Sequence, residues 1–92
     1  MADTSTINIT DIDITLGKPY KVILFNDEDH GYDEVVRQVD KASNCGPSRA
    51  AAITQEAHVT GRAVVYTGHL ERCEHVESVL NEIRLGTKIE EA

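Results

Sequence analysis

The feature that most constrains this chain is an apolar run that stops abruptly at a cluster of acidic residues. Residues 20–25 read Tyr-Lys-Val-Ile-Leu-Phe, and Asn26, Asp27, Glu28 and Asp29 follow directly. A run rich in Val, Ile and aromatic residues is typical of a buried strand. Polar residues in the loop after such a strand often form a binding site. The rest of the chain is therefore interpreted around this cluster.

Two local explanations compete with a binding site. Five acidic residues lie between Asp27 and Glu34, and carboxylates favour the start of a helix because they complement its free N–H groups and its dipole. This helix-cap interpretation stays open. A calcium loop needs a glutamate at the twelfth position, but counting from Asp27 that position is Gln38, which excludes it.

Length and charge exclude several classes of protein. Ninety-two residues with 40% apolar content predict one domain with room for one site. A formal charge of −7 opposes binding to nucleic acid or to an anionic membrane surface. We find no membrane-spanning run, secretory signal or transit peptide, and expect a cytoplasmic protein. Cys45 and Cys73 are expected to be small thiols, although a disulfide between them stays open.

The chain divides at its first proline. Residues 1–18 are mostly polar, and the structure-breaking residues Gly17 and Pro19 stand at their end. This pattern predicts a flexible amino-terminal extension at 1–18 ahead of a core domain at 19–92. Alternating isoleucines at positions 7–14 leave a docked edge strand as the alternative for this extension.

The core domain shows six predicted elements. They are strands at 20–26, 62–67 and 85–90, and helices at about 32–42, 47–60 and 69–84. Each helix has one apolar stripe; in the second it consists of Ala50, Ile53, Thr54 and Ala57, and in the third of Leu70, Cys73, Val76, Leu80 and Ile83. The β-α-α-β-α-β order predicts a two-layer α+β domain, a three-stranded antiparallel sheet with three helices on one face.

Other clusters of reactive residues carry weaker signals. His69 and Cys73 share a helix face with His75 nearby, but a zinc site would need a fourth ligand. Cys45 has no evident base or oxyanion loop, so covalent catalysis is disfavoured. We therefore expect no enzyme activity, no metal and no cofactor. His58 ends an apolar helical face just before Gly61, where a histidine commonly bonds a last carbonyl.

The strand with its Asn26-Asp27 end, followed 31 residues later by Ala57-His58 and then by Gly61-Arg62-Ala63, resembles the ClpS family of protease adaptors. The resemblance runs from about Pro19 to the carboxyl terminus. It implies the same order of elements and a role in the bacterial N-degron pathway. Such adaptors bind proteins through a destabilising first residue and pass them to a Clp AAA+ ATPase and its peptidase. It also implies that the extension serves delivery.

The resemblance assigns roles to particular residues, and their chemistry fits these roles. A free α-ammonium group has three N–H donors and a charge, so it needs about three acceptors. Asn26, Asp27 and His58 would supply them, with Glu28 and His30 as secondary contacts. Because His58 must be neutral to accept, binding should weaken as the pH falls. The pocket for the first side chain would be lined by Tyr32, Val35, Thr54 and Ala57.

The sequence departs from the family at several of these positions. Methionine is typical where Tyr32 and Thr54 stand, valine is common at Ala57, and a threonine-proline pair usually replaces His30-Gly31. Threonine is shorter than methionine and leaves space beside the Cβ atom of a ligand. We therefore expect Leu, Ile and Val to be accepted as first residues, because pocket contacts can discriminate by roughly 1–3 kcal/mol.

The expected partner surface is less well matched. Family members present a lysine on the third helix to the ATPase N-domain, and the stretch 73–76 lacks it, although Glu71 and Glu74 could serve in docking. The alternative function is a module of the same fold that binds an amino-terminal residue or a peptide without delivery to a Clp ATPase. We expect a monomer in either case.

Overall fold

The computed structural model describes residues 17–92. The first 16 residues lie outside this range, so the two alternatives for the extension and the boundary expected at residue 18 stay predictions. The elements follow the predicted order: β1 (Tyr20–Phe25), α3 (Tyr32–Ser43), α4 (Pro47–Thr60), β2 (Arg62–Gly68), α5 (Leu70–Leu80), the 3-10 helix η1 (Asn81–Ile83) and β3 (Thr87–Glu91).

The apolar run of β1 forms the centre of the sheet. The strand order is β2-β1-β3, and β1 pairs antiparallel with both neighbours, so that Val22 faces Tyr66 on one side and Ile89 on the other. Val22, Ile23 and Leu24 are at most 1% exposed. A strand without polar alternation fits this central position, because neighbouring strands and helices cover its side chains.

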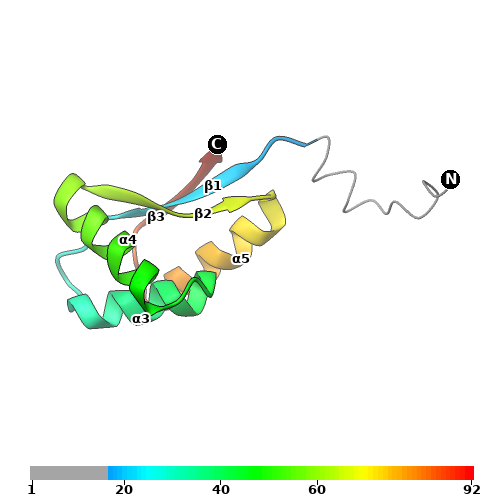
Figure 1. Ribbon diagram of the computed structural model, residues 1–92. Coiled ribbons are helices and arrows are strands. Elements are labelled where there is room, and N and C mark those ends of the chain that lie inside the picture. Colours follow the sequence, from blue (N-terminus) through cyan, green and yellow to red (C-terminus); the bar gives the residue numbers. More distant parts are fainter. Residues whose placement is uncertain (1–16) are drawn as a thin grey trace, which may run out of the picture.

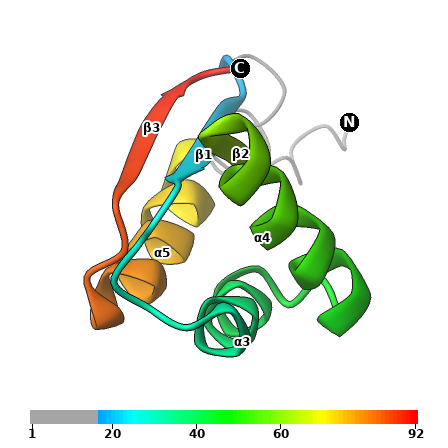
Figure 2. The same cartoon turned by 90° about the vertical axis from the view of Figure 1, so that its left-hand side faces the viewer.

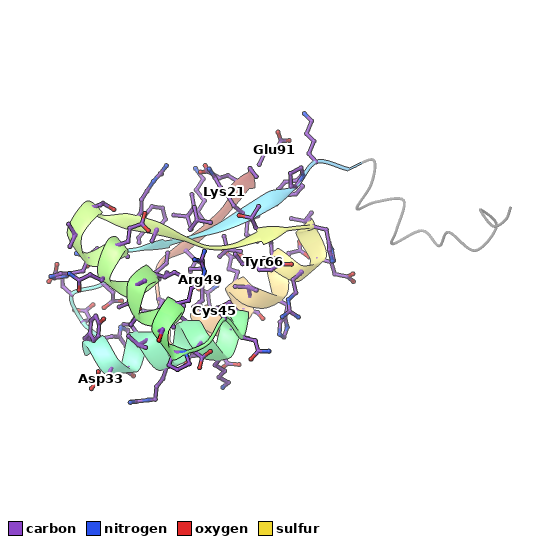
Figure 3. The ribbon with its side chains drawn as sticks, viewed as in Figure 1. Lys21, Asp33, Cys45, Arg49, Tyr66 and Glu91 are labelled. Carbon is purple, nitrogen blue, oxygen red and sulfur yellow. The ribbon has the colours of Figure 1, made fainter. Side chains whose placement is uncertain are left out.

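The helices all lie on one side of the sheet (Figures 1 and 2). Helices α4 and α5 lie against the strands, and α3 packs on both of these helices. Figure 3 shows Lys21 on the side of the sheet away from the helices. The predicted two-layer α+β fold is therefore confirmed, and the core lies between the sheet and the helical layer.

Residues at the two ends of α4 determine where this helix begins and ends. Pro47 stands in its first turn, where no N–H donor is needed. At the other end Gly61 adopts a left-handed φ of 98°, and its N–H donates to the Ala57 carbonyl over 2.9 Å. Glycine suits this conformation because a Cβ atom would strain it. Between these ends Ala50, Ile53, Thr54 and Ala57 are buried, as predicted.

The third predicted helix differs from the structure. Helix α5 ends at Leu80, and the 3-10 turn η1 and the left-handed Arg84 (φ 64°) then reverse the chain into β3, which begins at Thr87 rather than at residue 85. Leu70 stands at the first position of α5 and is 39% exposed, and Ile83 belongs to η1 and is only half-buried. The inward face of α5 instead includes Val79.

The burial of α5 predicts a measurable contrast in stability. Replacing Leu80, which is fully buried, by alanine should lower the free energy of unfolding by about 2–5 kcal/mol, because it leaves a cavity. Leu70→Ala on the same helix is the matched control and should cost less than about 1 kcal/mol, since the side chain is partly exposed. Urea denaturation measures both. Equal losses would contradict the described packing.

Candidate functional site

The carboxyl end of β1, the start of α3 and the last turns of α4 come together at the left of Figure 1. Residues of these three segments line a pocket of about 450 Å³. All nine residues that the sequence predicted to touch a bound amino terminus line it. The full lining consists of Leu24, Phe25, Asn26, Asp27, Glu28, His30, Tyr32, Val35, Thr54, Gln55, Ala57 and His58. Segments far apart in the sequence therefore form one site.

A backbone hydrogen bond brings the polar residues of the two segments together. The Asn26 N–H donates to the Gly61 carbonyl over 2.9 Å. Asn26 directly follows β1, and Gly61 ends the helix that carries His58. Asn26 and His58 are both exposed, so their side chains are available to a ligand at the pocket surface.

The Asp27 carboxylate is held by the loop that follows it. Its Oδ1 accepts hydrogen bonds from the backbone N–H groups of Asp29 (2.7 Å) and His30 (2.8 Å). Its Oδ2 lies 2.9 Å from Nδ1 of the His30 imidazole. A side chain that bonds the backbone two or three residues ahead folds the loop into an Asx-type turn. The orientation of Asp27 is thus set by its own loop.

These contacts shift the pKa values of both partners. Burial raises the pKa of Asp27, but the bonds from His30 and Asp29 outweigh it, so the pKa lies below its ordinary value. Contact with Asp27 raises the pKa of His30 against the opposing effect of burial. The stabilising effect of the His30 contact is therefore complete below pH 6.5 and is lost as the pH rises through the raised pKa of His30. The stabilising effect of the bonds to the Asp27 carboxylate is present above pH 3.8 and is lost as the pH falls through the lowered pKa of Asp27.

Asn26 also has a partner within the loop. Its Nδ2 donates to Oε2 of Glu28 over 2.7 Å. An amide nitrogen carries two N–H donors, and the amide oxygen accepts up to two bonds. One donor and the carbonyl oxygen of Asn26 can therefore still serve a ligand.

The other end of the pocket is mostly apolar. Val35, Thr54 and Ala57 are buried there, and Tyr32 is 49% exposed at the first turn of α3. The Thr54 hydroxyl donates to the Ala50 carbonyl over 2.8 Å, which satisfies this polar atom within α4. The Tyr32 hydroxyl donates to the Ala51 carbonyl over 3.3 Å and thereby links α3 to α4.

Two predicted residues lie away from the pocket, and three residues that line it were not predicted. Glu71 and Glu74 are exposed on α5 and do not line the pocket, and their expected role in docking stays a prediction. The sequence reasoning missed Leu24, Phe25 and Gln55. The position of Phe25 beside Asn26 could have indicated it, whereas nothing in the helical pattern singles out Gln55.

The described residues also bear on the other clusters considered from the sequence. Cys45 and Cys73 are free thiols, and burial raises the pKa of Cys73. Within residues 17–92, no three His, Cys, Asp or Glu side chains converge as metal ligands do. No helix in this range is long and apolar enough to cross a membrane.

Comparison with known proteins identifies related chains. The model of the family "ATP-dependent Clp protease adaptor protein ClpS" matches residues 16–85. The E3 ubiquitin-protein ligase UBR1 of Drosophila melanogaster is 32% identical over 74 residues, and human UBR2 is 36% identical over 61 residues. These matches cover 79% and 66% of this chain but only 4% of each ligase.

A solved structure shares the fold. The structure of Agrobacterium tumefaciens ClpS2 bound to L-phenylalaninamide superposes with a TM-score of 0.76 at 21% identity. The match covers 82% of this chain and 98% of that one. The arrangement of strands and helices around the pocket is therefore that of a known fold.

The contact between His30 and Asp27 can be tested by titration. In Asp27→Asn the imidazole loses its negative partner, so the pKa of His30 should fall toward 6.5. NMR titration of the His30 ring signals measures this change. Glu28→Gln removes a neighbouring carboxylate that bonds Asn26 and does not contribute to the shift of His30, so it should leave the pKa of His30 nearly unchanged. A fall of the same size in both variants would contradict a specific pair.

Proposed function

We propose, since the chain belongs to the ClpS family of Clp protease adaptor proteins, that it binds the free amino-terminal residue of other proteins and delivers them for proteolysis in the cytoplasm. One observation carries the proposal: a single pocket has acceptors for an ammonium group at one end and buried apolar side chains at the other. A protein's first residue has the same two parts, a charged amino group and a side chain.

The polar end has acceptors suited to an α-ammonium group. The group has three donors and a full charge, so an anionic acceptor such as Asp27 strengthens its binding. The Asn26 carbonyl and a neutral His58 ring complete the set, and the free donor of the Asn26 amide can bond the first peptide carbonyl. Acetylation removes the charge and donors of the ligand and leaves these groups unpaired.

The solved structure of a relative supports this assignment. The Agrobacterium tumefaciens ClpS2 structure holds L-phenylalaninamide, whose amino group is free and whose carboxyl is an amide, as in a peptide. The matched ubiquitin ligases are far longer, and this chain covers 4% of them. We do not extend ubiquitin transfer, the activity in the names of these ligases, to this chain.

The apolar end favours aliphatic first residues. Thr54 is shorter than methionine, and its hydroxyl already bonds Ala50, so its methyl group can contact the ligand without an unpaired polar atom. Ala57 adds space beside it. One methylene changes burial by about 0.8 kcal/mol. We therefore propose that Leu, Ile and Val are accepted.

Delivery would use the exposed face of α5. Glu71 and Glu74 lie three residues apart on this helix, which places them on neighbouring positions of one face. They could dock the N-domain of a Clp ATPase, although the lysine of other family members is missing from the stretch 73–76. Capture without delivery is the second possible role, and this departure on α5 favours it.

The proposed function is tested with peptides that differ only at residue one. Fluorescence anisotropy should show binding of peptides that begin with Leu, Ile or Val, and acetyl-Leu should lose most of the affinity because the site is left with unpaired acceptors. Arg at residue one is the control for a charged side chain. Equal binding of free and acetylated Leu peptides would rule out recognition of the amino group.

The side-chain preference is tested at Thr54. Thr54→Met should weaken binding of Ile and Val peptides roughly tenfold more than binding of the Leu peptide, since the longer side chain crowds branching at Cβ. Thr54→Val is the matched control: it keeps the shape, loses only the hydroxyl and should preserve the order of preference. Uniform weakening of all three peptides in Thr54→Met would refute selection at this position.

A further inference from the structure

We propose that His30 regulates the site by controlling how much negative charge Asp27 presents to the ligand, so that protonation of His30 weakens binding of an ammonium group. The inference rests on the proposed function, because it assumes that Asp27 contacts a bound amino terminus. It concerns a histidine at a position where the family usually has threonine, and it assigns this residue a role distinct from that of His58.

The geometry separates the orientation of Asp27 from its charge. Two backbone N–H groups, those of Asp29 and His30, already hold Oδ1 over 2.7 and 2.8 Å. The His30 imidazole approaches the other oxygen, Oδ2, over 2.9 Å. Orientation of the carboxylate therefore does not depend on the imidazole. What the ring changes, when it gains a proton, is the net charge at this end of the pocket.

Limited exposure strengthens this effect. The side chains of Asp27 and His30 are only 14% and 19% exposed, and Nδ1 of His30 is shielded from solvent. Salt and water screen such a pair less than one on the open surface. A protonated ring at 2.9 Å therefore neutralises much of the field that would attract an incoming ammonium group, and a neutral ring leaves it in place.

Other charged groups also face the imidazole. Asp27 and Glu34, from the loop and from the first turn of α3, raise the pKa of His30, and the backbone carbonyl of Ile83 in η1 adds to this, while burial lowers it. Glu28 and His58 line the same pocket. His58 is a second histidine at this pocket, so an experiment must separate the roles of the two histidines.

Thermodynamic reciprocity supplies an independent measurement. If protonation of His30 weakens binding of an ammonium group, binding of that group must weaken protonation of His30 by the same factor. A peptide that binds tenfold more weakly to the protonated form should lower the pKa of His30 by one unit at saturation. This measurement uses the unmodified protein, so it does not depend on the folding of a variant.

The main experiment compares the wild type with His30→Gln, using a Leu peptide and anisotropy from pH 9 to pH 5. Glutamine can still donate to Oδ2 but carries no charge. The amino group of the peptide itself titrates near pH 8. This change affects both proteins equally, as does any contribution of His58, so both cancel in the ratio of the two Kd values at each pH. The ratio of wild-type to variant Kd should rise from near one at pH 9 to at least threefold at pH 5.

The outcomes separate this inference from the proposed function. If the wild type binds no peptide with a free amino terminus at any pH, the proposed function itself is wrong. If the wild type binds but the ratio is constant, or the peptide leaves the pKa of His30 unchanged in NMR titration, the role of His30 is overturned. A ratio that rises at low pH, is unchanged in a His58→Gln background and is matched by a fall in the pKa of His30 supports it.

Discussion

The site depends on one short backbone contact, the hydrogen bond from Asn26 N–H to the Gly61 carbonyl. It joins the residue after the central strand to the residue that ends α4. Gly61 can make this contact because its left-handed conformation turns the chain out of the helix and directly into β2, where Arg62 pairs with Phe25. The pairing of β1 with β2 thus brings the helix end with His58 beside Asn26 and Asp27. The proposed binding residues come from distant parts of the sequence and are brought together where β1 pairs with β2.

The two ends of the pocket arise from different kinds of local structure. The polar end is a loop that bonds to itself, with Asp27 anchored on the N–H groups of Asp29 and His30. The apolar end is the continuation of the core stripe of α4, in which Thr54 satisfies its hydroxyl on Ala50. Rigid helices and a self-bonded loop reduce the entropy lost on binding. Binding in the proposed pocket would therefore need little ordering, and its selectivity would depend on the side chains that line it.

Sequence reasoning succeeded where a local pattern determines the structure. The apolar run predicted a buried strand, and the stripe from Ala50 to Ala57 predicted the buried face of α4. The order of the elements predicted the fold, whereas the pocket residues were grouped by the resemblance to the ClpS family. Sequence reasoning failed at the end of the third helix, because an apolar period of 3.6 continues across Asn81–Ile83 while the chain has already tightened into a 3-10 turn. The pairs Asn26–Glu28 and His30–Asp27 were also beyond reach, since spacing does not determine which of several neighbouring polar side chains bond one another.

These loop contacts change how recognition should be understood. The groups that would bind an amino terminus are partly engaged beforehand, because one Asn26 donor bonds Glu28 and Asp27 lies against His30. Binding is then an exchange of partners, and its free energy is the difference between the bonds gained and those lost or weakened. Such a difference is small compared with either set of bonds. Modest changes in the charge of a neighbour such as His30 can therefore alter the affinity without altering the fold.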